Sequence, residues 1–412
     1  MGSFSSPLSG LTAAQADLQS VSNNLANIST TGYKDQSLTF SDVFSQAGTT
    51  NGSGDPVQTG SGVAVSSTAT AFTEGSLDTT GTASNMAISG NGFFVTQSTS
   101  GLQDYTRAGD FTTNSGGQLV TPNGELVLGF PAANGIVNTS AALQPLQVGS
   151  ITSPPVASTT VGITANLDSS TAVGDTATSS TLSIFDSLGT AHTLTVSYAK
   201  TAANTWTYTA SVPSSDLTGA TGTSTIVGSG TLNFDTSGAL SSMSNVVPIS
   251  ISNLNDGAAS MSISVPFGTA ANSTITQTSL ASATSATSTD GHASGTLSSY
   301  SVNTDGTIQG TFSSGISLVL GQVAVASFAN TQGLVNTSNN NYQPTASSGS
   351  PVIGIAGTGG RGTVIGGSVE ESNVDIASEF AKLIQAQQAY SANAKSVTTF
   401  NQLSQATLSM LQ

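Results

Sequence analysis

The last forty residues, 373–412, carry the longest uninterrupted helical pattern in the chain. No glycine or proline follows Gly367, and apolar or small side chains recur in alternating steps of four and three residues, the spacing of a heptad seam. The seam consists of Ile376, Phe380, Leu383, Tyr390, Ala394 and Val397, with Gln387 filling one gap. Ser372 and Asn373 are suitable N-caps, so we predict a helix over 374–411, about 57 Å long at 1.5 Å per residue. Such a helix is too long for an ordinary globular core, and its seam has no partner in the C-terminal segment.

A second amphipathic helix is predicted at the N-terminus. Its apolar positions again step by three and four, with Leu11, Leu18 and Leu25 as the main members. Ser6 and Pro7 are typical of an N-cap and a first helical residue, and Gly32 ends the pattern. Two unpartnered stripes at opposite ends of one chain are most simply buried against each other and against copies in neighbouring subunits. We therefore expect subunit-interface residues at Leu11, Leu18, Leu25, Ile376, Phe380, Leu383, Tyr390 and Val397.

Everything between the two helices has strand and turn patterns. Alternation of polar and apolar residues, as in 194–198, indicates sheets with one wet face. The predicted fold class is mainly β with long terminal α-helices, in a nested arrangement of several domains. We expect a terminal helical coiled-coil domain (1–32 plus 370–412), connecting arms (33–70 plus 355–369), a split β domain (71–145 plus 285–354) and an inserted outer β domain (146–284).

The charge content excludes several classes of function. Only 7% of the residues are charged, against about 25% in typical domains, and the net charge of −15 includes just six basic residues. No basic patch can form, so we expect neither nucleic-acid binding nor binding to anionic membranes. No apolar window of about 18 residues exists, so no membrane insertion is expected. The N-terminus has no basic segment followed by an apolar run, which predicts export without a cleaved signal peptide. The absence of cysteine suits an exported protein that folds without disulfides.

No motif predicts catalysis or a cofactor. Residues 357–362 match the dinucleotide pattern G-x-G-x-x-G, but no helix opens there and no βαβ unit surrounds it, so a turning strand is the better interpretation. His192 and His292 each lack a nearby carboxylate or second histidine at ligand spacing in the sequence. We find no nucleophile–base pair and no paired carboxylates, so we expect no enzyme activity, no cofactor and no catalytic or metal site.

Several aspartates precede turn residues. Asp186, Asp235, Asp256 and Asp305 are of this kind, and side-chain bonds to the backbone of the turn explain them better than paired catalytic acids. A Ca²⁺ ion at one of these turns is the alternative.

Several motifs together resemble the bacterial flagellar hook and rod family of axial proteins, over nearly the whole chain. The N-terminal motif occupies 9–11, 22–27 and 31–34; the hook and rod branch is matched at 90–95, 105–111, 326–330, 333–334 and 372–375. Residues 185–189 and 204–206 are similar to the middle domain of hook proteins.

The resemblance implies a tubular homopolymer with the terminal helices as inner wall, the split β domain as middle layer and the inserted domain outside. It implies a flexible universal joint in the flagellar hook, at the cell exterior, that passes torque from rod to filament and houses the export channel. The partners it implies are other copies of the chain, the distal rod and hook–filament junction proteins, the hook cap and the flagellar export apparatus.

Two alternatives remain at this point. A distal rod protein of the flagellar basal body shares both ends of the pattern, but such proteins are much shorter and lack the middle domain. A secreted β-rich adhesin would account for the Ser/Thr-rich β regions, but it gives no reason for matched terminal heptads.

Overall fold

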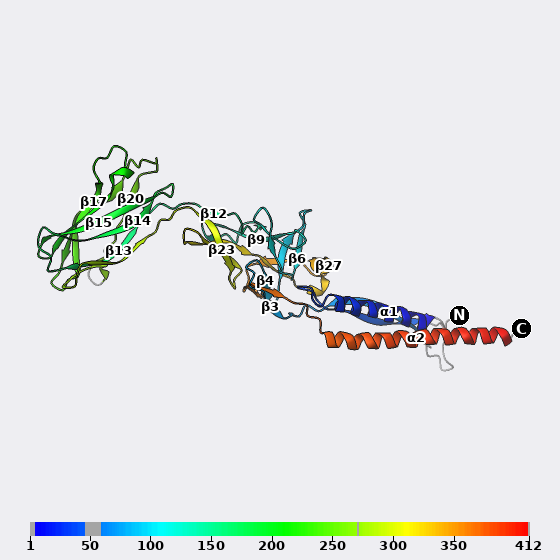
Figure 1. Ribbon diagram of the computed structural model, residues 1–412. Coiled ribbons are helices and arrows are strands. Elements are labelled where there is room, and N and C mark those ends of the chain that lie inside the picture. The colour runs from blue at the N-terminus through cyan, green and yellow to red at the C-terminus, as the bar shows by residue number, and fades with distance from the viewer. Residues whose placement is uncertain (1–4, 46–58, 270–271, 411–412) are drawn as a thin grey trace. The chain divides into compact units, whose positions relative to one another are not determined.

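The computed structural model describes residues 5–45, 59–269 and 272–410, and it is mainly β with one long helix near each end (Figure 1). Helix α1 spans Ser5–Ala26 and helix α2 spans Ile376–Met410. The predicted fold class is thereby confirmed. The predicted helix start is not, because α2 begins two residues later than expected and Asp375 caps it, accepting a hydrogen bond from the Ser378 amide at 2.9 Å.

The chain divides into two compact units. Unit 1 comprises 1–149, 299–310 and 318–412, and unit 2 comprises 150–298 and 311–317. Strands β23 (Gly295–Val302) and β24 (Thr307–Phe312) contain residues of both units. Each unit buries its own set of apolar side chains.

Unit 1 contains the two helices and many short strands. These strands are β1 (Gln36–Ser45), β2 (Thr59–Thr70), β3 (Leu77–Thr79), β4 (Met86–Ser89), β5 (Phe93–Gln97), β6 (Gln103–Thr106), β7 (Thr112–Thr113), β8 (Leu119–Val120), β9 (Leu126–Ala133), β10 (Ile136–Val137), β11 (Gln144–Pro145), β25 (Ser317–Val323), β26 (Val325–Ser327), β27 (Val335–Ser338), β28 (Asn341–Gln343), β29 (Val352–Gly354), β30 (Thr363–Gly366) and β31 (Ser368–Glu370). The main sheet follows the order β25-β9-β5-β6-β28-β27.

Two small ladders join the early and late parts of unit 1. Strand β30 pairs with β4 and strand β31 pairs with β3, both antiparallel. Edge-to-face aromatic contacts fill the adjoining core, in which Phe93 touches Phe72, Phe328 and Tyr342 at ring-centroid distances of 5.5, 5.7 and 5.7 Å. Such contacts stabilise a core beyond the area that they bury. The segment that leads into α2 is thus part of the β core.

Unit 2 is built around a five-stranded antiparallel sheet. Its strands and short helix are β12 (Thr152–Ser153), β13 (Val161–Asp168), β14 (Thr176–Phe185), β15 (Ala191–Ala202), β16 (Thr205–Pro213), η1 (Ser214–Asp216), β17 (Ser224–Phe234), β18 (Leu240–Val247), β19 (Ile249–Ile251), β20 (Met261–Ile263), β21 (Ile275–Thr278) and β22 (Ala283–Thr289). The order β14-β15-β16-β17-β18 faces further strands across one apolar core. Leu194, Val196 and Tyr198 of β15 all point into this core, as their alternation predicts.

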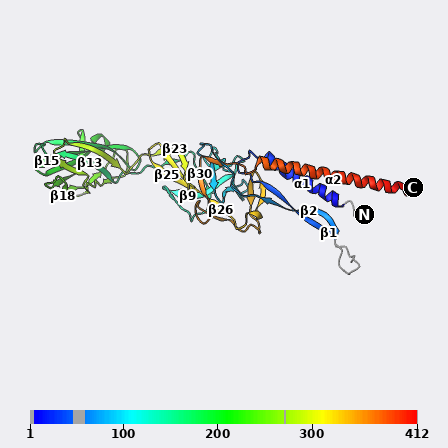
Figure 2. The same ribbon diagram turned by 90° about the horizontal axis from the view of Figure 1, so that it is seen from below.

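A long antiparallel hairpin follows α1 in the chain. Strands β1 and β2 pair from Gln36 opposite Thr70 to Ser45 opposite Thr59, while residues 46–58 of the predicted connecting arm lie outside the described residues. Figure 2 shows the hairpin beside α1. Contact is close at Gly62, whose φ is +115° and where a Cβ atom would lie 2.0 Å from the Ser9 Oγ. A residue with a Cβ atom would be strained at this φ and would displace the Ser9 hydroxyl.

Replacing Gly62 with valine should separate the hairpin from α1. The clash and the unfavourable backbone conformation together cost about 1–3 kcal/mol, so amides of β1 and β2 should exchange hydrogen faster. Hydrogen exchange followed by mass spectrometry measures this. Gly60→Val is the matched control, because a Cβ atom at Gly60 meets nothing within 4 Å. Equal exchange rates in the two variants would show that the close contact is unimportant.

Candidate assembly surface and helix junction

The two terminal helices of the chain lie side by side in unit 1 (Figures 1 and 2). Small residues allow the close approach: Ala13 and Ala14 of α1 and Ala386 of α2 are buried. A Cβ atom at Gly10 would lie 2.9 Å from the side-chain amide of Asn393, so the Asn393 side chain packs directly on α1 at this level. The two ends of the chain thus pair with each other within one chain.

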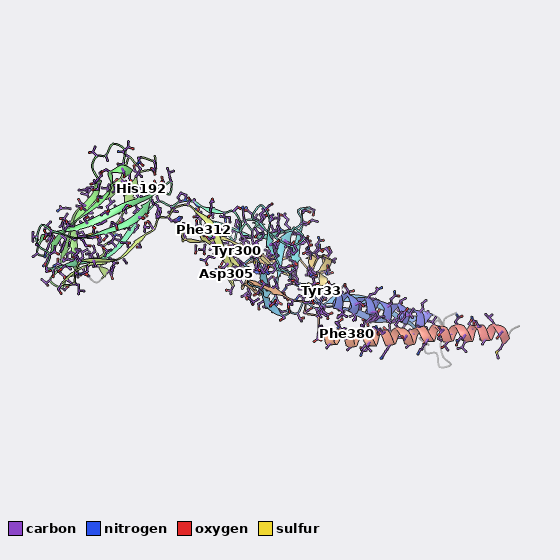
Figure 3. All side chains as sticks on the ribbon, viewed as in Figure 1. Tyr33, His192, Tyr300, Asp305, Phe312 and Phe380 are labelled. Atoms are coloured by element: carbon purple, nitrogen blue, oxygen red, sulfur yellow. The ribbon has the colours of Figure 1, made fainter. Side chains whose placement is uncertain are left out.

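The expected interface residues divide into two groups. Leu11, Leu18 and Leu25 of α1 and Leu383 and Val397 of α2 are half-buried. The other three members of the α2 seam stay at the surface, with exposed fractions of 52% for Ile376, 47% for Phe380 and 38% for Tyr390. Figure 3 shows Phe380 on the outside of α2. The structure therefore buries only part of the seam within one chain.

The buried face of α2 is offset from the heptad seam. Its fully buried positions are Glu379 and Ala386, neither of which belongs to the predicted seam. Large apolar residues remain exposed along the rest of the helix, namely Ile376, Phe380, Ile384, Tyr390, Leu403, Leu408 and Met410. All positions from 401 to 410 are exposed. A helix surface with this many uncovered apolar side chains is typical of an interaction site.

At the base of the helix pair, Asn24 connects both helices to the β1 strand. Its side chain is 1% exposed and its amide nitrogen lies 2.5 Å from an oxygen of Asp35 and 3.2 Å from an oxygen of Glu379. The Asn24 side-chain oxygen accepts a hydrogen bond from the Tyr33 hydroxyl at 3.0 Å and one from the Gln36 amide at 3.1 Å. A fully bonded buried network of this kind fixes the relative positions of the elements that it joins.

Charges around Asn24 shift the ionisation of their neighbours. Burial, followed by the nearby Asp35 and Glu379, raises the pKa of Tyr33 to about 12. Burial also raises the pKa of Asp35, against the attraction of the Lys382 ammonium. The Lys382 ammonium lies 2.5 Å from Glu379, and this hydrogen bond raises the pKa of Lys382. The network thus includes one cation, from α2 itself.

A second buried cluster lies where the chain leaves α1 and where it enters α2. Glu370 is fully buried; one of its oxygens lies 2.5 Å from Lys34 and the other 3.2 Å from Arg107. Arg107 also donates to the backbone oxygens of Ile88 and Gly90 at 3.1 and 2.6 Å. Desolvation lowers the pKa of Lys34 in spite of the adjacent carboxylate. We call Lys34, Arg107 and Glu370 the junction triad.

The junction triad joins three segments that are far apart in sequence. Lys34 follows α1, Arg107 follows β6, and Glu370 ends β31 just before α2. Gly32, with φ +68°, donates its amide to the Glu370 backbone oxygen at 2.7 Å, and a Cβ atom there would lie 2.5 Å from the Ala108 nitrogen. The requirement for glycine at this point is therefore both conformational and steric.

Asn373 completes the junction, although the sequence indicates only a helix cap for it. Its side-chain oxygen accepts from the Asp35 amide at 2.7 Å, and its nitrogen donates to the backbone oxygens of Ala71 and Thr73 at 2.8 and 3.1 Å. The asparagine therefore links the start of α2 to both arms of the hairpin. This use of the side chain explains why Asp375 is the cap instead.

Sequence reasoning did not identify the junction residues as a site. Asn24, Lys34, Arg107 and Asn373 lie in the motifs that carry the family resemblance, but no role follows from those motifs, and Glu370 lies in none of them. The small number of basic residues could have indicated this buried ion cluster. Lys34 and Arg107 are two of only six basic residues, and both lie in β-rich, apolar segments. Such residues are rarely buried unless a buried carboxylate pairs with them.

The expectation that His192 has no nearby carboxylate is wrong. Its Nδ1 atom lies 3.0 Å from Asp216, and its Nε2 atom lies 3.1 Å from Asp186 and 3.9 Å from Asp256. Sequence spacing missed this cluster because Asp216 and Asp256 come from turns remote in the chain. His292 makes only a ring contact with its neighbour's backbone oxygen, at 3.0 Å from Ala293.

Donor atoms of Asp186, His192 and Asp256 lie within 4.8 Å of one another, a spacing that a metal ion could bridge. Each ring nitrogen of His192 is nevertheless already at hydrogen-bond distance from a carboxylate. The contacts of the cluster are therefore those of a hydrogen-bonded ion pair.

The other motifs agree with their structural interpretations. Asp186, Asp235, Asp256 and Asp305 each accept a hydrogen bond from a backbone amide two residues ahead, which confirms turn bonding. The glycine-rich segment 357–362 turns without forming a helix and leads into β30. Among the described residues, no helix is apolar and long enough to span a membrane.

Replacing Glu370 with glutamine should destabilise unit 1 strongly. Lys34 and Arg107 would keep buried charges without a counter-ion, a change that costs about 3–5 kcal/mol. Urea unfolding followed by circular dichroism measures the loss. Glu371→Gln is the control, because Glu371 is exposed. This substitution removes the same charge one residue away. A similar midpoint in both variants would mean that the triad contributes no stability.

Comparison with known proteins agrees with this architecture. Family models match residues 7–34 (flagella basal body rod protein), 87–166 (flagellar hook protein FlgE/F/G D1 domain), 157–292 (flagellar basal body protein FlaE D2 domain) and 365–410 (flagellar basal body rod FlgEFG protein C-terminal).

Curated relatives match over nearly the full length of both proteins. The flagellar hook proteins FlgE of Borreliella burgdorferi and Salmonella typhimurium are each 31% identical to the chain, covering 98% and 97% of it and 98% of their own length. The hook protein of Escherichia coli is 32% identical over 97% of the chain and 98% of its own length. Neither the distal rod nor the adhesin alternative accounts for full-length matches to hook proteins. The chain therefore belongs to the flagellar hook protein family and is a structural component of the hook.

Proposed function

We propose that the chain polymerises into a hollow, flexible tube in which the terminal helices form the inner wall. The uncovered apolar stripe of α2 is the observation that carries this proposal. Ile376, Phe380 and Tyr390 are exposed in the single chain, yet they sit at regular heptad positions of a 35-residue helix. Helices with such a stripe bury it against further helices, and neighbouring copies of the same chain supply them.

In this arrangement each terminal helix has two contact surfaces. One is the intrachain surface with Ala13, Ala14 and Ala386. The other consists of Ile376, Phe380 and Tyr390, together with the half-buried Leu11, Leu18, Leu25, Leu383 and Val397, and faces other copies. The terminal helical domain (1–32 plus 370–412) would form the inner wall, the split β domain (71–145 plus 285–354) the middle layer and the inserted domain (146–284) the outside.

The junction triad gives a physical route for torque. Force on the helices has to reach the β strands of unit 1, and a flexible linker would absorb it. Here the two segments next to the helices are held by Lys34, Arg107 and Glu370 and by Asn24 and Asn373. Buried charge-assisted hydrogen bonds are short and directional, so the base of the helix pair moves with the β core.

The inserted domain (146–284), which would contact its neighbours on the outside of the tube, contains almost no cations. Lys200 is the single basic residue of 146–284, and it is 6% exposed, with its ammonium 2.5 Å from the Ser169 backbone oxygen and 5.7 Å from the Trp206 ring centre. Few strong ion pairs can therefore form between the inserted domains of neighbouring copies. Hydroxyl and amide side chains make water-bridged contacts at low cost, and such contacts exchange easily as the tube bends.

The partners beyond other copies follow from this role. A hook of this kind joins the distal rod at one end and the hook–filament junction proteins at the other, grows under a hook cap and receives subunits from the flagellar export apparatus. We further propose that the chain acts without enzyme activity, cofactor or metal.

Replacing Phe380 with aspartate should block polymerisation while leaving the single chain folded. The side chain is 47% exposed, so the charge costs little in the monomer, but in the polymer it would be buried without a partner. Electron microscopy after salt-induced polymerisation provides the readout. Gln385→Asp, which adds the same charge at another exposed position of α2, should still form tubes. Normal tubes from the Phe380 variant would refute the assembly surface.

Bending stiffness of isolated hooks should depend only weakly on salt. Few charge pairs can form between outer units, and screening acts only on charges. Thermal fluctuations of hooks imaged across a wide range of ionic strength give the stiffness. Introducing complementary lysine and glutamate residues on neighbouring outer units should make hooks stiffer at low salt. A steep salt dependence in the unmodified protein would contradict the proposed exchange of neutral contacts.

A further inference from the structure

Three turns of unit 2 meet at one side chain. His192 lies near the start of β15 and is 4% exposed (Figure 3). Asp186 follows β14, Asp216 ends the short helix η1, and Asp256 lies in the turn between β19 and β20. Backbone bonds also join these turns, with the Asn255 amide donating to the Asp216 oxygen at 3.0 Å. His192 is therefore the common contact of three segments separated in sequence.

Both ring nitrogens of His192 face carboxylates. Nδ1 faces the Asp216 carboxylate at 3.0 Å, and Nε2 faces the Asp186 carboxylate at 3.1 Å. A neutral imidazole carries one N–H and one lone pair, so one of these contacts would then set a lone pair against a carboxylate oxygen. Only the imidazolium can donate to both. The remaining carboxylate, Asp256, lies 3.9 Å from Nε2.

Among the described residues, no lysine or arginine forms an ion pair with these three carboxylates. Lys200, the single basic residue of unit 2, is directed at the Ser169 backbone oxygen and the Trp206 ring instead. Within the described residues, the ion pairs that involve Asp186, Asp216 and Asp256 all have His192 as their partner. Three carboxylates thus converge on one ionisable base.

We propose that His192 is an imidazolium in the folded protein and acts as a pH-sensitive brace that closes this end of unit 2. When the proton is bound, the ring donates to Asp186 and Asp216 and draws the three turns together. When it is lost, one carboxylate oxygen that faces the ring has no ring N–H to accept from, and the surplus negative charge has no counter-ion. This end of unit 2 then opens more readily.

The direction of the pH effect follows from linkage. Burial by itself would lower the pKa of His192, but its hydrogen bonds with Asp216 and Asp186 outweigh this and raise the pKa above 6.5. Burial also opposes ionisation of Asp186, but its hydrogen bonds with His192 and with the Thr190 and Leu188 amides hold its pKa below the ordinary value. A base with a raised folded pKa stabilises the fold fully below its unfolded pKa. The stabilisation is lost as pH rises through the folded pKa.

Nuclear magnetic resonance on the full-length His292→Gln protein tests the protonation state, since His192 is then the one histidine left. We expect the titration midpoint of His192 to lie above 6.5, the ordinary value for histidine, with both ring nitrogens protonated below that midpoint. In an added Asp216→Asn variant the midpoint should fall. A midpoint at or below 6.5, or a single protonated ring nitrogen below the midpoint, would overturn the proposal.

Unfolding in urea tests the brace independently. Trp206, the single tryptophan, is fully buried in unit 2, so its fluorescence follows this unit within the intact chain. Above pH 6.5, the unfolding equilibrium constant should rise by up to tenfold per pH unit until the folded pKa is passed. His292→Gln should keep this dependence, and His192→Gln should remove it. The same dependence in both variants would refute the brace.

Should His192→Gln fail to fold, Asp256→Asn gives the second test, since it removes the most distant carboxylate, and it should shift the pH dependence to lower pH. Metal analysis of the purified protein provides a further check. A stoichiometric, chelator-removable divalent ion whose loss lowers the urea midpoint would show that a metal occupies the cluster in place of the second proton, which would overturn the proposal.

Discussion

The fold of unit 1 depends on one buried carboxylate. Glu370 holds Lys34 with one oxygen and Arg107 with the other, and nearly all of the three side chains is removed from water. Burying charges costs several kcal/mol for each ion unless the partners are close and well bonded. The backbone oxygens of Thr73, Ile88 and Gly90 supply further acceptors. Because each charge needs the other two segments in place, the start and the end of the chain fold as one structure.

The position of this triad explains how the helices can be both firmly attached and incompletely buried. At their bases, Asn24, Asn373 and Glu379 hold them through directional hydrogen bonds. Further out, small residues bring α1 and α2 into contact, and α2 continues beyond with all of 401–410 exposed. A helix pair anchored at one end can present a long apolar stripe in a fixed orientation. A polymer of such subunits gains stability from contacts that the monomer does not make.

The chain carries few charges, and half of its basic residues are buried. Three of the six basic residues, Lys34, Arg107 and Lys200, are buried, where each fixes a junction or a core. The polar groups at the surface of unit 2 are mainly hydroxyls, amides and carboxylates. This distribution separates two mechanical demands, because strong interactions hold each subunit together while weak, replaceable ones connect the outer parts of neighbouring subunits.

Features with a local origin could be predicted from the sequence by itself. The heptad steps determined a helix at each end, the alternation of β15 determined which side chains point inward, and the turn aspartates bind the backbone two residues ahead, as predicted. Each of these depends on neighbours within a few residues. Composition likewise limited the function to classes that need no basic patch.

The tertiary structure decided everything that requires partners from distant segments. Glu379 and Ala386 of α2 face inward and Phe380 faces outward. The reason is that Asn24 and the small residues of α1 leave room for Glu379 and Ala386. The tertiary structure also moved the helix cap to Asp375, since Asn373 is occupied by the hairpin. It placed Glu370 between Lys34 and Arg107, and three aspartates around His192. The sequence does not show which charge will meet which, because these residues come together only when strands separated by tens to hundreds of positions are packed.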